Sequence, residues 1–337
     1  MVDAHVERSA VDSTAGDVFR LQRDFLAGEA WLDATDRGVI TVTGPDRLVW
    51  LHSLLSQDLL GLEPGVTTEA FILSPHGKIE HSLMIVDDEE TTWLLAEPGH
   101  QDDVGAWLAS MKFRMEVALA KPELRVIATW GPAEKEFASH SLVVFTDPWP
   151  QVSQGSVGYH EGDHPGSSWS VHYSAAPTTT PDPIGQSAIS REAFEGLAIA
   201  AARPSIAEVD EKSLPHELDW LRTAVHLNKG CYRGQESVAK VHNLGHPPRR
   251  LTLLHLDGTP SILPLPGDEV RTHEKSIGVV TRSAWHYELG PIALALLRRA
   301  APLGEVTVLT SEGVALAANQ EVIVPPDAGK AMPRRRL

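Results

Sequence analysis

The residue best suited to chemistry in this sequence is Cys231, the only cysteine among 337 residues. Its neighbours form a stretch that we call the cysteine loop: Lys229, Gly230, Cys231, Tyr232, Arg233, Gly234, Gln235 and Glu236. A thiolate attacks electrophiles and binds metals far better than the neutral thiol does. The positive charges of Lys229 and Arg233 favour the thiolate, whereas the carboxylate of Glu236 opposes it. The pattern predicts a reactive or ligating cysteine.

Two glycines, Gly230 and Gly234, flank the cysteine. Glycine permits backbone conformations and close approaches that a β-carbon forbids, so their spacing favours a sharply turned loop that presents Cys231 and Tyr232. The alternative is that Cys231 is a small buried hydrophobe in a tight turn. Composition alone leaves both interpretations open.

Histidines offer a second kind of chemistry, because His242 and His246 have a spacing that metal ligands use on helices. However, Gly245 and Pro247 disfavour a helix that runs through both positions. We therefore predict no metal site. Other histidines are interpreted as hydrogen-bonding residues of the surface or core, namely His52, His76 and His216.

Helical and β-like patterns alternate before the loop. A first helix is predicted from Val18, Leu21, Phe25 and Leu26, and a strand follows over residues 37–43. A second helix is predicted after Pro45 from Leu48, Leu51, Leu55 and Leu59. We interpret the polar residues on or beside this helix as a solvated face: His52, Ser53, Ser56 and Gln57.

Three short β-like runs, 69–73, 79–86 and 92–96, predict an antiparallel meander. A helix over 104–111 and a strand over 124–130 come next. This mixture predicts an α+β fold, and no glycine-rich strand-to-helix fingerprint supports a dinucleotide domain.

Composition shifts divide the chain into four predicted parts. Residues 1–146, which begin with a polar leader, form an N-terminal α+β region. Residues 147–183 are rich in Pro, Gly, Ser and Thr, and we interpret them as including an exposed connector or long loop, with a strand over 169–173 as the alternative for that part. They begin a central α+β region, 147–245, that carries the cysteine loop. Five short β-like segments, 250–256, 269–271, 277–281, 292–297 and 305–309, predict a β-barrel or sandwich over 246–325, followed by a disordered tail, 326–337.

The charge balance and cysteine count limit the class of protein. A net charge of −16 disfavours nonspecific attraction to nucleic acid or anionic membranes. One cysteine excludes an internal disulfide, and the sequence shows neither a secretory signal nor an apolar run of membrane-spanning length. These features predict a cytoplasmic protein without a membrane partner and without a direct, nonspecific nucleic-acid partner.

The cysteine loop, read as Lys-Gly-Cys-Tyr-x-Gly-Gln-Glu, resembles the signature of the YgfZ family, the folate-binding relatives of the glycine-cleavage T-protein (aminomethyltransferase). The resemblance extends over most of residues 32–309 and includes Leu73-Ser74-Pro75-His76-Gly77-Lys78-Ile79, Leu214-Pro215-His216-Glu217 and Arg249-Arg250-Leu251. It implies a three-lobed, aminomethyltransferase-like (GcvT-like) fold around a central folate cleft, with a C-terminal β-barrel.

Two departures from the transferases bear on function. The transferases carry an aspartate pair where this chain has His81-Ser82, and an Arg-x-Glu-Ala-Gly segment where it has Arg203-Pro204-Ser205-Ile206-Ala207. In the transferases these acids position the folate and assist one-carbon transfer. Their absence implies that glycine-cleavage activity has been lost, so whether this chain is an enzyme stays open.

The resemblance implies a tetrahydrofolate-binding accessory protein for iron–sulfur cluster assembly or repair, with Cys231 in the catalytic role and iron–sulfur client or assembly proteins as partners. Two alternatives stay open: a folate-dependent one-carbon transferase acting on a small amine or a tRNA base, and a noncatalytic folate-binding module. The residues expected to contact tetrahydrofolate or its one-carbon derivative are Lys78, Arg203, Tyr232, Glu236 and Arg249.

Overall fold

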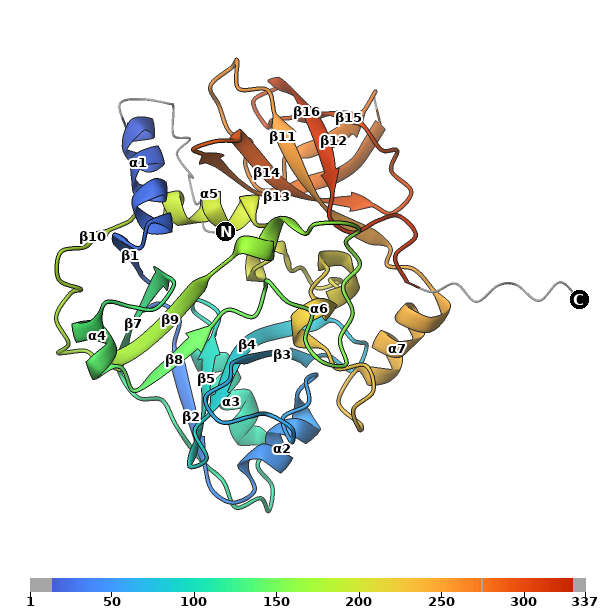
Figure 1. Ribbon diagram of the computed structural model, residues 1–337. Coiled ribbons are helices and arrows are strands. Elements are labelled where there is room, and N and C mark those ends of the chain that lie inside the picture. Colours follow the sequence, from blue (N-terminus) through green and yellow to red (C-terminus); the bar gives the residue numbers. More distant parts are fainter. Residues whose placement is uncertain (1–13, 274, 330–337) are drawn as a thin grey trace, which may run out of the picture.

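The computed structural model describes residues 14–273 and 275–329 as two open β-sheets and a closed β-barrel (Figure 1). The polar leader predicted over residues 1–13 and residues 330–337 of the predicted tail lie outside the described residues. The α+β class and the C-terminal barrel are confirmed.

The first open sheet has the strand order β3-β4-β5-β2-β6. Its strands are β2 (Val39–Thr43), β3 (Thr68–Leu73), β4 (Ile79–Asp87), β5 (Thr91–Ala96) and β6 (Ala118–Ala120). The meander predicted from three short runs is confirmed, because β3 pairs with β4 and β4 with β5 in antiparallel register. The helices α2 (Arg47–Leu54) and α3 (Gln101–Ser110) contribute Leu51 and Leu108 to the same hydrophobic cluster as this sheet.

The second open sheet has the order β10-β1-β7-β9-β8. Its strands are β1 (Ala30–Asp33), β7 (Leu124–Trp130), β8 (Val143–Thr146), β9 (Val171–Pro177) and β10 (Ser187–Ala188). Three helices accompany it: α1 (Thr14–Leu26), α4 (Lys135–His140) and α5 (Arg191–Ala200). Within the segment 147–183, part of which is interpreted above as an exposed connector, the aromatic residues Trp149 and Trp169 are buried in the core. The alternative of a strand over 169–173 is confirmed in part, because β9 begins at Val171.

The barrel closes in the order β11-β14-β13-β12-β15-β16. Its strands are β11 (Arg249–Leu256), β12 (Glu269–Thr272), β13 (Lys275–His286), β14 (Gly290–Arg298), β15 (Glu305–Leu309) and β16 (Ala315–Val322). The sequence patterns indicated five of these strands and missed β16, because its buried residues Leu316 and Ala318 alternate with small and polar ones. The helix α5 packs against β13, which joins the barrel to the second sheet.

The short helix η1 (Pro165–Ser168) lies between β8 and β9 of the second sheet. Between α5 and the barrel come η2 (Ile206–Glu208), η3 (Pro215–Leu218), α6 (Leu221–Ala224) and α7 (Gln235–Leu244). One hydrophobic cluster contains residues of both open sheets, these connections and the barrel, including Phe71, Trp169, Trp220 and Leu294. No helix within the described residues is both long and apolar enough to cross a bilayer.

The polar face predicted on the second helix is wrong for Ser56 and Gln57. The helix α2 ends at Leu54, and the chain then turns inward, so that Ser56 is 0% and Gln57 3% exposed. The Ser56 hydroxyl donates to the Ala224 carbonyl at 2.6 Å, and the Gln57 amide donates to the Thr223 carbonyl at 2.8 Å. Both side chains therefore tie the end of α2 to α6.

Candidate functional site

The cysteine loop is docked on the turn of the β3–β4 hairpin through two glycines. Gly234 has φ +84°, and a β-carbon there would lie 2.6 Å from the Ser74 carbonyl oxygen and 2.9 Å from the Gly77 Cα. A β-carbon on Gly77, which has φ +71°, would in turn lie 3.2 Å from the Gly234 carbonyl oxygen. The two motifs that carry the family resemblance therefore meet, and each requires glycine where they touch.

Cys231 is exposed on this docked loop. The alternative that it is a buried hydrophobe in a tight turn is therefore wrong. Tyr232, the next residue, is 7% exposed and anchors the loop in the core. The loop thus has one side chain that holds it and one that it presents to solvent.

Lys229 fixes the start of the loop to the end of α2. Its Nζ donates to the carbonyl oxygens of Leu55 at 2.7 Å and Gln57 at 2.9 Å, and also to that of His52. Burial lowers the pKa of Lys229 to about 8. The charge assigned above to thiolate stabilisation is thus engaged by three backbone carbonyls, so Lys229 positions the loop.

Polar contacts made by the second half of the loop also hold it in place. Arg233 pairs with Glu80 of β4 at 2.8 Å, and Gln235 donates to the Lys229 carbonyl at 3.1 Å. Glu236 is exposed on the first turn of α7. Among the loop residues, Arg233 and Gln235 therefore help to hold the conformation that presents Cys231.

Two residues expected to contact folate brace the segment before the loop. The Lys78 Nζ donates to the Lys212 carbonyl at 2.6 Å. Arg249 pairs with Asp210 at 2.6 Å and with Glu217 at 2.8 Å. Both side chains lie on strands or turns that support residues 210–217, and neither lines the enclosed cavity described next.

That enclosed cavity, which we call the central cavity, has a volume of about 200 Å³ and is formed where the second sheet, α5 and the barrel meet. Its apolar wall includes Trp169 from the end of η1, Tyr173 from β9 and Phe194 from α5, which are 3%, 3% and 7% exposed. Its floor is the segment 203–207, where the transferases carry one of their acids. Of the five residues expected to contact folate, Arg203 alone lines this cavity.

Arg203 is the centre of a buried ion-pair network. It contacts Glu69 of β3 at 2.8 Å and Asp147 at 3.0 Å, and all three side chains are at least nine-tenths buried. Thr223 also donates to Glu69. Neither acid was predicted from the sequence, although a glutamate inside the apolar run of β3 was the available signal.

The hairpin position where the transferases carry an aspartate pair has a different arrangement here. Ser82 donates to Glu69 at 3.3 Å, so a carboxylate lies on the neighbouring strand. His81 turns to the other side and contacts His100 through their Nδ1 atoms at 2.9 Å. Glu69 does not line the central cavity. Its carboxylate pairs instead with the buried guanidinium of Arg203.

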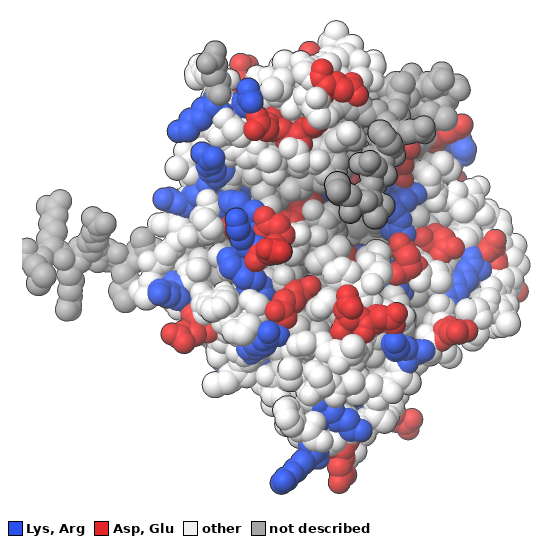
Figure 2. All heavy atoms as spheres, turned by 180° about the vertical axis from the view of Figure 1, so that it is seen from behind, with Lys and Arg blue, Asp and Glu red and all other residues white. Residues whose placement is uncertain are grey.

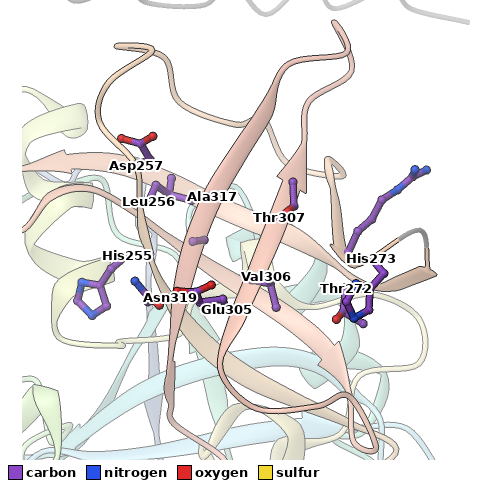
Figure 3. Close-up of a pocket in the computed structure, with 12 residues that line it drawn as sticks. His255, Leu256, Asp257, Thr272, His273, Glu305, Val306, Thr307, Ala317 and Asn319 are labelled. Atoms are coloured by element: carbon purple, nitrogen blue, oxygen red, sulfur yellow. The ribbon is translucent and has the colours of Figure 1, made fainter.

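A wider groove of about 610 Å³ crosses the barrel strands β11, β12, β15 and β16. Figure 3 shows His255, Thr272, Glu305 and Asn319 along it. None of the residues singled out in the sequence lines this groove. Figure 2 shows that acidic and basic side chains are interspersed over the face of the molecule seen there.

The predicted break in the helix between His242 and His246 is confirmed, because α7 ends at Leu244. His242 contacts the Tyr159 hydroxyl at 3.0 Å, whereas His246 contacts the Ala328 carbonyl at 2.8 Å. The two imidazole rings therefore bind different partners.

His216, interpreted above as a hydrogen-bonding residue, connects the cysteine loop region to η3. It is 0% exposed, and its Nε2 contacts the Val238 carbonyl of α7 at 3.1 Å. Burial lowers its pKa from 6.5 to about 3. The folded state therefore keeps this ring neutral at a pH where the unfolded state takes up a proton.

This difference predicts a loss of stability as the pH falls below 6.5 towards 3. At about pH 5 the contribution of His216 to the free energy of unfolding is lower by about 2 kcal/mol than at about pH 7.5. Urea unfolding at both values should show that the wild type loses about 2 kcal/mol more than a His216→Gln variant, which lacks the titrating ring. Equal losses in the two proteins would show that His216 is not buried in the neutral form.

Comparison with known proteins was made on sequence and on structure, and no family model matches the chain. It is 27% identical over 261 residues to the mitochondrial iron–sulfur cluster assembly factor IBA57 homolog of Mycosarcoma maydis, a match covering 66% of this chain and 57% of that protein. It is also 27% identical over 299 residues to the aminomethyltransferase of Moorella thermoacetica, covering 79% and 77% of the two chains. A putative chloroplastic transferase of Arabidopsis thaliana is 24% identical over 324 residues, covering 86% of this chain and 70% of that protein.

The fold matches the crystal structure of the glycine cleavage system aminomethyltransferase T from Bartonella henselae. The TM-score is 0.72 at 18% identity, and the match covers 94% of this chain and 91% of the other. This likeness confirms the GcvT-like fold. Together with the two motifs that meet at Gly77 and Gly234, the matches support the resemblance to the YgfZ family and to its aminomethyltransferase relatives.

Proposed function

We propose that this protein is a tetrahydrofolate-binding accessory factor for iron–sulfur cluster assembly or repair. The observation that carries the proposal is the separation of two sites: Cys231 is presented on a docked loop, and an enclosed cavity is lined by the segment 203–207. The relatives include one named as an iron–sulfur assembly factor and one named as an aminomethyltransferase, which supports both halves of the proposal.

The lining of the central cavity suits the flat, aromatic head of a folate. Flat aromatic ligands bind in mostly apolar pockets with a few placed polar groups, and Trp169, Tyr173 and Phe194 supply such walls. These residues would hold the ring system and exclude water from it. A bound tetrahydrofolate would supply one-carbon chemistry.

Cys231 supplies a sulfur ligand or a reactive thiol that is open to a partner. Stable iron–sulfur clusters are commonly held by four cysteine ligands, so one thiolate cannot hold such a cluster alone. The partner protein must provide the remaining ligands, and contact with Cys231 is shared or transient. An exposed thiol on a conformationally fixed loop suits such a transfer between proteins.

A one-carbon transferase is the second candidate, and the transferase relatives favour it. The buried acids argue against it, because Glu69 and Asp147 are bound to Arg203 and do not line the central cavity. Production of methylenetetrahydrofolate from an aminomethyl donor by the purified protein would support the transferase. Folate binding without turnover would favour the accessory factor.

Deletion of the gene in its own organism is expected to lower the activity of iron–sulfur enzymes, measured per amount of each enzyme. The wild-type gene should restore that activity, whereas Cys231→Ser should not, because the hydroxyl is a poor substitute for a thiolate. Asn228→Ala is the matched control, because Asn228 is exposed next to the cysteine loop and this variant keeps the Cys231 thiol.

Full rescue by Cys231→Ser would reject the role of the thiol and favour a noncatalytic folate-binding module. Unchanged iron–sulfur enzyme activity in the deletion strain would reject the accessory function itself.

A further inference from the structure

Two hollows adjoin beside the segment that leads into the cysteine loop, and together they form one groove, which we call the side groove. Their volumes are about 380 and 470 Å³. One wall is the segment 57–68, which joins α2 to β3, and the other is the segment 146–154, which begins at the end of β8. The two hollows share the lining residues Val66, Thr67, Pro148 and Gln151, so one continues into the other.

Both walls are hydrogen-bonded to the segment that precedes the cysteine loop. The His226 amide donates to the Ser56 carbonyl at 3.0 Å, and the Leu227 amide donates to the Gly155 carbonyl at 2.8 Å. This segment therefore runs between the two walls, and His226 itself lines the groove. Because the five residues from His226 to Cys231 span at most about 18 Å, a molecule held in the groove lies within reach of the thiol.

The side groove and its walls expose apolar side chains. Val66, which both hollows share, is 48% exposed, and Leu60 and Val152 of the two walls are 57% and 50% exposed. Exposed apolar side chains that gather around a groove are typical of sites that bind other proteins.

Polar side chains of the groove favour an extended peptide. Gln151 and Gln154 line it and are exposed, and their side-chain amides make no hydrogen bond with the described residues. An amide carries both a donor and an acceptor, so the two side chains can bind the N–H and C=O groups of an extended backbone. Apolar and polar groups together therefore suit a peptide segment better than a small apolar ligand.

The charge of the side groove selects among such segments. Asp58 and Glu63 line it, whereas no lysine or arginine does within the described residues. Glu63 is exposed and makes no ion pair in the described part of the chain. Asp58 lies 3.1 Å from His52, but burial and the charge of Lys229 lower the pKa of His52, so this ring stays neutral at neutral pH. The groove therefore favours a segment that carries positive charge.

We propose that the side groove docks an extended segment, bearing lysine or arginine, of the partner protein that meets Cys231. Apolar side chains of the segment contact Val66, and a basic side chain pairs with Glu63. This role rests on the proposed function and deepens it, because it names the surface that holds the iron–sulfur partner while the partner's own ligands approach the thiol.

Cys231 is the only cysteine of the chain, so a probe that forms a disulfide with it reports on docking. Two sets of peptides of about ten residues alternate valine with lysine or valine with glutamate, and each carries a cysteine at either end, activated as the 2-thiopyridyl disulfide. The Cys231 thiolate attacks the peptide sulfur, a mixed disulfide forms, and 2-thiopyridone leaves and is followed by its absorbance.

Docking raises the local concentration of the activated peptide near Cys231. At low ionic strength the lysine peptide should therefore react about tenfold faster than the glutamate peptide, and added salt should narrow the difference.

The double variant Glu63→Gln with Val66→Ser should slow the reaction of the lysine peptide about tenfold. Glu161→Gln with Val279→Ser is the matched control, because these two residues are also exposed and do not line the groove; the rate should be unchanged. The small reagent 2,2′-dithiodipyridine should react equally with all three proteins, which checks that the thiol and its loop are intact.

Equal rates of the lysine peptide with the wild type and with the groove variant would overturn this docking site and leave the proposed function intact. A glutamate peptide that reacts as fast as the lysine peptide would overturn the charge preference. Dimerisation of the wild type that the groove variant abolishes would assign the groove to a second copy of the chain, which also overturns the proposal. Failure of the proposed function itself would appear separately, as unchanged iron–sulfur enzyme activity in the deletion strain.

Discussion

Replacing Arg203 with methionine is expected to lower the free energy of unfolding by about 3 to 5 kcal/mol. The guanidinium pairs with Glu69 and Asp147, and these two carboxylates are 0% and 3% exposed. Methionine would preserve most of the packing against Trp149 and Trp220 but would leave both carboxylates without their cation. Buried charges that lose their partner are among the most destabilising changes in a protein.

Urea unfolding provides the measurement, with Arg191→Met as the matched control. Arg191 also pairs with a carboxylate, but that pair is nearly half exposed, so its loss should cost less than about 1 kcal/mol. Combining Arg203→Met with Glu69→Gln and Asp147→Asn should recover part of the stability, because no buried charge then remains unpaired. If the two arginine variants lost similar amounts of unfolding free energy, the buried network would stabilise the fold no more than an exposed ion pair does, which would contradict this prediction.

Replacing Gly234 with alanine is expected to abolish rescue of iron–sulfur enzyme activity as completely as Cys231→Ser does. The residue has φ +84°, where a side chain is strained, and its β-carbon would collide with the backbone at Ser74 and Gly77. Backbone atoms cannot move aside as a flexible side chain can. The cysteine loop would therefore leave the hairpin, and Cys231 would lose its fixed position.

The loop itself offers a control for this change. A β-carbon on Gly230 meets no atom within 4 Å, and this glycine is not in the left-handed region. Gly230→Ala should therefore rescue activity as the wild type does, in the same deletion strain and at the same protein level. Equal rescue by Gly234→Ala and the wild type would show that docking of the loop on the hairpin is unimportant for function.

Much of the fold could be predicted from local patterns. The meander of β3, β4 and β5 follows from short apolar runs between clear turns, and the barrel follows from spaced β-like segments. Ser56 and Gln57 could not be placed, because their burial depends on carbonyl groups of Ala224 and Thr223, far along the chain. Hydrogen bonds between distant segments leave no periodic signal.

The candidate site also has one part that could be predicted from the sequence and one part that could not. The cysteine loop is contiguous, so its residues and its turned shape could be anticipated from spacing and from its two glycines, whereas the sequence left the exposure of Cys231 open. The central cavity is assembled from residues between 32 and 282, and Tyr173 lies in a segment whose composition resembles that of a connector. Which polar groups remain available there depends on every ion pair around them.

The central claim is that the cavity beside the segment 203–207 holds a folate head, and crystals grown with folinic acid test it most directly. The expected result is ring density between Trp169, Tyr173 and Phe194. Folinic acid bound elsewhere, or an empty cavity at saturating ligand, would contradict a folate site here.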